Sequence, residues 1–301
     1  MKFTETQKNE MVGLLFKRYE SSGFTAEGKF ATTIDLSAAD MSNLKNGKFE
    51  MLGDAKWAKI ASFLKFGKEG QEGWQTANTY MFDFVTKQLA VCQSGSLNAI
   101  LIDKPGTGKT FAAKWYAANR QNVFYIDCSI YNRRAPFLLA LAKAVGLGQV
   151  KVNEAFELVV QALTNIESPL IIFDEAGDLD NGSILVIKSL YNALEDHAGM
   201  YLMGSDGLKR KINVGMNYCT VGYTELFSRF GKRFQSALPE DNPVEALKII
   251  KEMAEDIALA NGIEDAASIK KIQERLSQNG IGDLRQTKRE IKKLQKNGLQ
   301  N

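Results

Sequence analysis

Apolar and polar positions follow two different rhythms along this chain. From residue 76 onward, short apolar runs are separated by longer segments in which apolar positions recur every three or four residues. The short runs predict strands and the longer segments predict amphipathic helices. The predicted strands lie at residues 97–102, 123–127, 170–173 and 200–203, with a fifth at 234–238. Strands that alternate with helices are typical of an α/β fold with a parallel sheet.

Both ends of the chain carry helical periodicity without such runs. We expect an all-α domain at residues 1–66, a glycine-rich linker at 67–75, an α/β core at 76–241 and a helical lid at 242–301. In the first domain, Ser37 followed three residues later by Asp40 predicts a capping box. Two short helices about a turn resemble the helix-turn-helix of repressor-type domains, although a small protein-docking domain has the same pattern.

The turn after the first predicted strand has the composition of a phosphate-binding loop. Its glycines allow backbone N–H groups to point inward at a polyphosphate, and a predicted helix begins directly after them. We expect Lys109 to contact the β- and γ-phosphates and the Thr110 hydroxyl to coordinate Mg²⁺. The nucleotide-binding residues expected here are Lys104, Pro105, Gly106, Thr107, Gly108, Lys109, Thr110 and Phe111.

One position of this loop departs from the usual pattern. The pattern G-x-x-x-x-G-K-[ST] requires glycine where this chain has Asp103. A carboxylate there either weakens nucleotide affinity by lying near phosphate or requires a slightly different exit from the strand.

A second acidic element follows the third predicted strand. Residues 170–175 read LIIFDE, an apolar run that ends in two carboxylates. Because parallel strands present catalytic groups at their carboxyl ends, we expect Asp174 to bind Mg²⁺ and Glu175 to orient a water on the γ-phosphate. Taken alone, the segment better fits a buried strand followed by an acidic turn. Together with the Lys109 loop, it predicts hydrolysis of ATP to ADP and phosphate.

Composition restricts the setting more than the chemistry. The 301 residues are 45% hydrophobic and 24% charged, with a net charge of only +3, which by itself does not indicate nucleic acid binding. Three unpaired cysteines (Cys92, Cys128 and Cys219) favour a reducing compartment. The polar start and the lack of a long apolar stretch predict a cytoplasmic protein without a membrane partner.

The order of the remaining polar motifs resembles an AAA+ ATPase over residues 76–301. Behind the Lys109 loop and LIIFDE come a polar strand end at Ser205 and Asp206, the run S-R-F around Arg229, and G-D-L-R ending at Arg285. The resemblance implies that Ser205 or Asp206 senses the nucleotide and that Arg285 reports the γ-phosphate to the lid. It also implies an arginine finger acting on a neighbouring subunit: Arg229, or less favourably Arg233.

Within that class, the architecture is similar to the bacteriophage Mu B, TnsC and IstB group of transposition regulators. That resemblance implies a bacterial, phage or mobile-element ATPase that forms a homo-oligomeric ring or helical filament on double-stranded DNA with little sequence preference. It further implies that the protein selects a transposition target, activates a transposase, and disassembles when ATP is hydrolysed. The residues expected to contact DNA are Arg133, Arg134, Lys209, Arg210 and Lys211 in the core, and Ser42, Asn43 and Lys45 in the first domain.

Two alternatives share the same ATPase residues. A helicase loader similar to DnaC would bind a replicative helicase instead of a transposase. A nucleotide-switched transcription regulator would bind ATP without turning it over, and Glu175 argues against this class because a pure switch does not need a residue placed for water.

Overall fold

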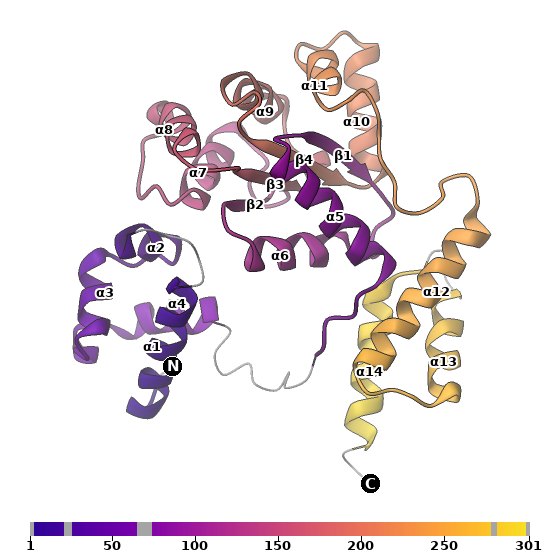
Figure 1. Ribbon diagram of the computed structural model, residues 1–301, viewed down its shortest axis with the longest axis horizontal. Coiled ribbons are helices and arrows are strands. Elements are labelled where there is room, and N and C mark those ends of the chain that lie inside the picture. Colours follow the sequence, from indigo (N-terminus) through magenta and orange to yellow (C-terminus); the bar gives the residue numbers. More distant parts are fainter. Residues whose placement is uncertain (1–2, 21–25, 65–73, 278–281, 299–301) are drawn as a thin grey trace.

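The computed structural model describes residues 3–20, 26–64, 74–277 and 282–298. A central sheet with its covering helices lies between two groups of helices, one from each end of the chain (Figure 1). The expected linker at 67–75 falls almost entirely outside the described residues.

The sheet consists of four parallel strands in the order β1-β4-β3-β2, which confirms the predicted α/β class. The strands are β1 (Asn98–Ile102), β2 (Val123–Asp127), β3 (Leu170–Asp174) and β4 (Gly199–Gly204). Successive side chains point to opposite faces, so Ile171 and Phe173 enter one apolar cluster whereas Leu170 and Ile172 enter the other. Burial on both faces explains why these strands are nearly continuous apolar runs.

The fifth strand predicted at 234–238 is wrong. Only one bridge forms, in which Gln235 exchanges backbone hydrogen bonds with Ile100 and Ile102, each 2.8 Å long. Two residues further on, the N–H of Ala237 donates to the carboxylate of Asp103 at 2.7 Å instead of continuing the ladder. The segment then leaves the sheet toward the last helices of the chain.

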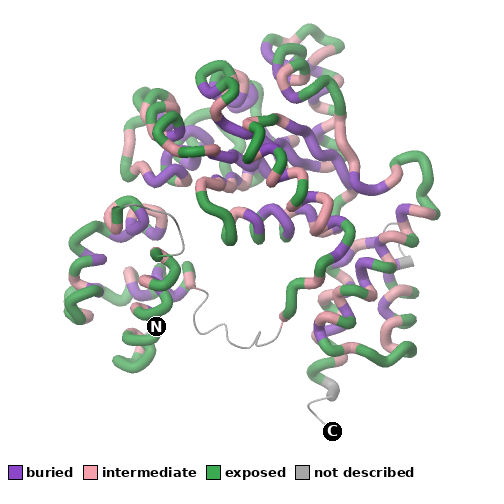
Figure 2. The backbone as a smooth tube through the Cα atoms, in the orientation of Figure 1, coloured by how far each residue is buried: buried purple, intermediate pink, exposed green. Residues whose placement is uncertain are grey.

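Helices cover both faces of the sheet. One face packs against α7 (Arg134–Ala144), α8 (Val152–Thr164), α9 (Asn181–Ala193), α10 (Asp206–Asn217) and α11 (Tyr223–Arg229), with the short η3 (Ala176–Asp178) behind β3. The other face packs against α5 (Tyr80–Ser94) and α6 (Lys109–Asn119). Figure 2 shows the resulting buried layer on either side of the strands.

The last three helices share the second of these cores. They are α12 (Pro243–Ala260), α13 (Ala266–Ser277) and α14 (Leu284–Gly298). The side chain of Asn242 caps α12 by accepting the N–H of Glu245, and Pro243 occupies the first turn, where it loses no hydrogen bond. Ile250 and Met253 of α12 are buried with residues of α5, so this group is held on the core rather than hanging free.

The N-terminal helices enclose a core of their own. They are α1 (Glu5–Glu20), α2 (Glu27–Thr33), α3 (Ala38–Lys45), the short η1 (Phe49–Met51) and α4 (Asp54–Leu64). Trp57, Phe30 and Leu15 fill the centre. The predicted capping box is present: the Ser37 hydroxyl accepts the N–H of Asp40, and the Asp40 carboxylate accepts the N–H of Ser37.

The N-terminal helices meet the core at α7. Asp35 forms a salt bridge of 3.1 Å with Lys143, and the Thr32 hydroxyl donates to the carbonyl oxygen of Gly146 at 3.3 Å. Neither contact involves the carboxyl edge of the sheet.

None of the helices in the described residues combines the length and apolar character needed to cross a membrane.

Candidate nucleotide site

The carboxyl ends of three strands bring the candidate residues together. The loop after β1 carries Lys109, the end of β3 carries Asp174 and Glu175, and β4, which ends at Ser205, lies between them in the sheet. Open parallel sheets bind ligands at this edge. Residues from distant parts of the chain therefore meet at one edge of the sheet because of the crossover connections.

The phosphate-binding loop has the backbone that its glycines predict. Gly106 and Gly108 have φ angles of 78° and 101°, which side chains disfavour. Gly108 precedes α6, and no side chain caps that helix. The first N–H groups of α6 are thus left for an anion, and the helix dipole favours negative charge there.

Lys109 is buried, with 7% of its surface exposed. Its Nζ donates to the carbonyl oxygens of Asp103 at 2.8 Å and Lys104 at 2.7 Å. Burial lowers the pKa of the ammonium group, and the negative charges of Asp103, Glu175 and Asp174 oppose that shift. The additional negative charge of a polyphosphate would stabilise the charged lysine further.

Both carboxylate oxygens of Asp174 are engaged. Oδ1 accepts the N–H of Glu175 at 2.9 Å, and Oδ2 accepts the hydroxyl of Tyr125 at 2.6 Å. Asp174 is 2% exposed. Tyr125 comes from the neighbouring strand β2, and the sequence offered no signal for its role because it looks like any strand residue. Its hydroxyl fixes the orientation of a carboxylate expected to bind Mg²⁺.

Glu175 stands at the end of β3 in a left-handed conformation, with φ of 51°. A residue other than glycine in this region is uncommon, and such geometry is concentrated at functional sites. Burial and the neighbouring charge of Asp174 raise the pKa of its carboxyl, and the charge of Lys109 opposes the rise. A carboxyl with a raised pKa is a better proton acceptor when ionised, as a residue that orients water requires.

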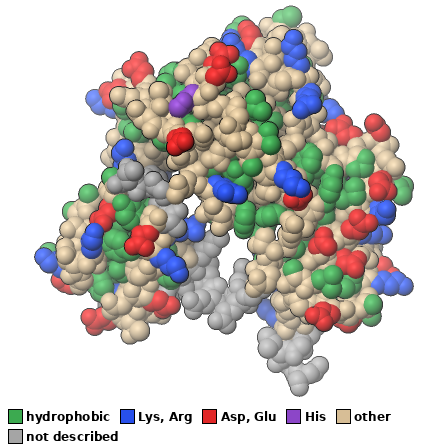
Figure 3. All heavy atoms as spheres, in the orientation of Figure 1, with side chains coloured by type: hydrophobic (Ala, Val, Ile, Leu, Met, Phe, Trp, Pro, Cys, Tyr) green, Lys and Arg blue, Asp and Glu red, His purple; other side chains and the backbone are tan. Residues whose placement is uncertain are grey.

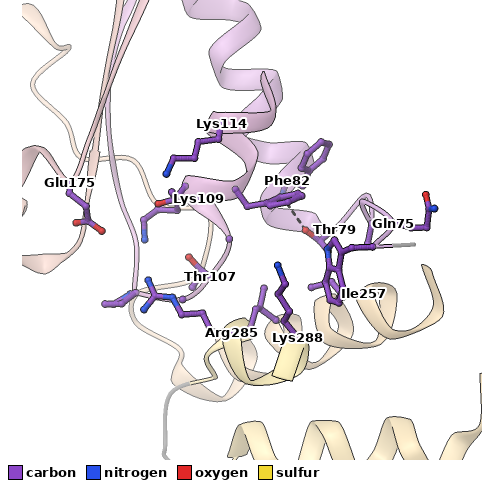
Figure 4. A pocket seen from close by; sticks show the side chains of 18 residues that line it. Gln75, Thr79, Phe82, Thr107, Lys109, Lys114, Glu175, Ile257, Arg285 and Lys288 are labelled. Carbon is purple, nitrogen blue, oxygen red and sulfur yellow. Dashed lines mark hydrogen bonds between the residues drawn. The ribbon is translucent and has the colours of Figure 1, made fainter. Parts of the chain in front are cut away.

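The described residues enclose a cavity of about 390 Å³ between the phosphate-binding loop and α14. In Figure 4, Glu175 and Lys109 lie on the same side of it, and Arg285 and Lys288 extend toward it from α14. The lining residues are Trp74, Gln75, Ala77, Thr79 and Phe82, Pro105 to Phe111, Lys114, Glu175, Ile257, Leu284, Arg285 and Lys288. The volume and mixed lining are typical of a small-molecule site.

The loop and α14 touch directly. The N–H of Leu284 donates to the carbonyl oxygen of Gly106 at 2.9 Å, and the Asp283 carboxylate accepts the N–H of Arg285 at the start of the helix. Arg285 therefore lies beside the loop, as the AAA+ resemblance implies for a residue that reports the γ-phosphate.

Sequence reasoning missed one wall of the cavity. Trp74 and Thr79 come from the segment that leads into α5, and Phe82 lies in the first turn of that helix. The Lys288 ammonium lies 5.0 Å from the ring of Trp74. Ile257 looked like an ordinary core position of a helix. The non-helical stretch with an aromatic residue before α5 was the available signal.

Several expected residues do not line the cavity. Lys104 forms part of the loop but is not a lining residue, and neither are Ser205 and Asp206 at the start of α10. Arg229 is half-buried, with its guanidinium 5.1 Å from the ring of Tyr191, and its Nη1 has no hydrogen-bond partner among the described residues. Arg233 is exposed. Neither arginine lines the described cavity.

The basic residues expected at DNA differ in their availability. Arg133 and Arg134 are exposed and form no salt bridge in the described part of the chain. Lys209 is paired with Glu240 at 2.6 Å, whereas Arg210 is exposed. Lys211 is held inside the fold. Its ammonium donates to the carbonyl oxygens of Gly177 and Leu179, and burial lowers its pKa.

The expected DNA contacts in the N-terminal helices are partly occupied as well. Lys45 forms a salt bridge of 2.6 Å with Glu27, Ser42 is exposed, and Asn43 is half-buried.

Comparison with known proteins agrees with this geometry. Residues 93–212 match the family model described as AAA domain. No curated protein matches the sequence. The Orc1 protein of Aeropyrum pernix, solved in complex with DNA, is 17% identical, with a TM-score of 0.50 over 69% of this chain and 56% of that one.

Two weaker similarities have TM-scores below 0.5. Cdc6p of Pyrobaculum aerophilum is 15% identical, with a TM-score of 0.45 over 69% of this chain and 66% of that one. NtrX of Brucella abortus is 12% identical, with a TM-score of 0.44 over 86% of this chain and 58% of that one. The chain thus spans less than two thirds of each of these structures. The fold is an α/β P-loop AAA+ core, and together with the family match it supports an AAA+ ATPase.

Proposed function

We propose that this chain is a DNA-binding AAA+ ATPase that binds ATP with Mg²⁺ between its phosphate-binding loop and its lid. The observation that carries this proposal is that Lys109, Glu175 and Arg285, three residues from three different parts of the chain, line the same cavity. A phosphate-binding loop, a carboxylate and an arginine of the lid around one cavity are the groups that phosphoryl transfer to water requires.

Each residue has a role that its environment supports. The N–H groups of the loop and Lys109 hold the phosphates. Thr110 and Asp174 would hold Mg²⁺, which when bound would stabilise the negative charge that develops on the phosphate oxygens. Glu175 orients the attacking water. Because Arg229 and Arg233 do not reach the cavity of their own chain, completion of the site by a second copy makes hydrolysis depend on assembly.

We further propose that assembly takes place on double-stranded DNA. Arg134 packs beside Gly182 at the start of α9, and Arg210 lines a hollow with Asn181 on the same part of the surface. The two basic segments therefore both lie near the start of α9, from where their cations can contact phosphates. The Orc1 structure of similar fold was solved with DNA, which is consistent with this surface use.

The narrower role follows from the architecture. A helical unit ahead of an AAA+ core and a short helical lid resembles the Mu B, TnsC and IstB regulators, so we propose that the oligomer selects a transposition target and activates a transposase. Hydrolysis of ATP would then release the oligomer from DNA. Copurification with a transposase supports this role, and copurification with a replicative helicase contradicts it.

An ATPase assay with and without duplex DNA, combined with negative-stain imaging, tests the proposal. We expect nucleotide-dependent rings or filaments on DNA and turnover that DNA stimulates. Glu175→Gln should abolish turnover while assembly is retained, and Glu157→Gln, an exposed carboxylate on α8, should change neither. Turnover that survives Glu175→Gln, or monomers on DNA whatever the nucleotide, would reject the proposal.

A further inference from the structure

The carboxylate of Asp103, at the position where phosphate-binding loops usually have glycine, is hydrogen-bonded to a segment far along the chain. Asp103 is 5% exposed, and its Oδ2 accepts the N–H of Ala237 at 2.7 Å and, more weakly, the N–H of Leu238 at 3.4 Å. The Ser236 hydroxyl lies 3.3 Å from the same oxygen. A single side chain from the end of β1 thus holds three successive residues of another segment.

Those three residues belong to the connector between the core and the lid. The connector, residues 235–242, begins at the bridge to β1 and ends at the cap of α12. Ala237 and Leu238 are buried in the same cluster as Ala246 and Ile250 of α12. The position of the connector therefore determines where the lid helices start.

The backbone of Asp103 contacts the phosphate-binding lysine. Its carbonyl oxygen accepts a hydrogen bond from Nζ of Lys109. Among the negative charges that stabilise the Lys109 ammonium, the Asp103 carboxylate has the largest effect. Burial raises the pKa of the Asp103 carboxyl, and the N–H of Ala237 and the charge of Lys109 oppose the rise. One residue is consequently bonded to the nucleotide-binding lysine on one side and to the lid connector on the other.

We propose that Asp103 is a positioning residue that couples occupancy of the phosphate-binding loop to the position of the lid. This inference rests on the proposed ATP site and assigns a role to the departure from the glycine pattern. When Lys109 turns toward phosphate, its bond to the carbonyl of residue 103 changes, and the same residue carries the bonds to the connector. Glycine at this position has no side chain and leaves the N–H of Ala237 buried without that partner.

Hydrogen exchange at the connector tests the structural half of the coupling. In Asp103→Gly, we expect the amide of Ala237 to exchange at least about tenfold faster than in the wild type, because it loses its acceptor. Asp103→Asn should retain much of the protection, since its amide oxygen can accept the same bond. Asp241→Ala removes an exposed carboxylate from the same connector and should leave exchange at Ala237 unchanged.

ATP affinity, measured by titration with a fluorescent analogue, tests the functional half. We expect Asp103→Gly to weaken ATP binding by about tenfold, a typical coupling between two sites. If Asp103 acts by positioning the lid, Arg285→Ala should reduce ATP affinity by a clearly smaller factor in the Asp103→Gly variant than in the wild type. A merely structural loss of stability would leave the two effects additive.

The outcomes separate this inference from the proposed function. A wild-type chain that binds no ATP overturns the proposed function and the coupling together. ATP binding by the wild type, with additive effects of the two substitutions or with unchanged exchange at Ala237 in Asp103→Gly, overturns the coupling alone.

Discussion

At the scale of single residues, the site depends on buried polar groups whose partners come from distant parts of the chain. Asp174 is held by the hydroxyl of Tyr125 and by the N–H of Glu175. Lys109 is held by carbonyl oxygens of its own loop. Because each of these groups would be costly to bury without a partner, the bonds fix the orientation of the side chains before any nucleotide arrives.

Replacing Tyr125 by Phe tests this orientation. The substitution keeps the ring and removes the hydroxyl, so we expect a loss of about 1 kcal/mol in the free energy of unfolding. We also expect the Mg²⁺ concentration for half-maximal ATPase activity to rise about tenfold or more, as for other groups that orient metal ligands.

Tyr201→Phe is the matched control. Its hydroxyl is bonded to Gln88, away from the cavity, so it should alter stability alone. A Mg²⁺ dependence of Tyr125→Phe indistinguishable from that of Tyr201→Phe would show that Tyr125 does not position Asp174.

At the scale of elements, the phosphate-binding loop and α14 form one unit. A Cβ on Gly106 would lie 2.2 Å from Oδ1 of Asp283, closer than any non-bonded contact allows. Glycine is needed here for two reasons, its φ of 78° and the approach of the lid. The loop sequence therefore also serves the docking of a helix nearly 180 residues further along.

Gly106→Ala should separate the lid from the loop. We expect ATP affinity to fall by more than tenfold, because both the backbone conformation and the contact with Asp283 are disturbed. Limited proteolysis should also cleave the lid faster, since its docking is weakened.

Gly262→Ala isolates the contribution of backbone strain. Gly262 also has φ of 78°, but a Cβ there would meet no atom within 4 Å. It should cost about 1 kcal/mol in the free energy of unfolding and leave ATP affinity unchanged. Equal effects of the two substitutions on nucleotide affinity would argue against the contact with Asp283.

At the scale of the whole molecule, charge is distributed rather than concentrated. On the face shown in Figure 3, Lys and Arg side chains are interspersed with Asp and Glu, in keeping with a net charge of only +3. Any affinity for DNA must therefore come from local groups of cations that are free of acidic partners, and Arg133 and Arg134 are such a pair among the described residues.

Replacing both Arg133 and Arg134 by Ala should weaken binding to all DNA sequences alike. If each contacts one phosphate, the slope of log affinity against log salt should fall by about 0.9 for each arginine. The measurement is a salt titration of binding to duplexes of unrelated sequence.

The control removes two cations that are already paired. Lys87 and Lys248 form salt bridges with Asp83 and Glu245 of their own helices. Their replacement by Ala should leave the slope unchanged, and the same slope in the arginine variant would remove Arg133 and Arg134 from the DNA interface.

The sequence by itself determined the elements and the chemistry of the loops. The alternation of apolar runs and helical periodicity predicted the α/β class and the four strands that form, because burial on both faces of a parallel sheet leaves a local signature. The glycines before Lys109 and the carboxylates at the end of β3 were likewise visible as short motifs. Each of these features depends on neighbours within a few residues.

Only the tertiary structure decided what meets across the chain. The fifth predicted strand forms only a single bridge, and Asp103 is hydrogen-bonded to the connector. Tyr125 is hydrogen-bonded to Asp174, and Trp74 and Ile257 line the cavity. The Lys211 ammonium, which we expected to contact DNA, instead donates a hydrogen bond to the carbonyl oxygen of Gly177. These contacts join residues that are far apart in the sequence. Because the same side-chain types occur in many cores and on many surfaces, no local pattern predicts the contacts.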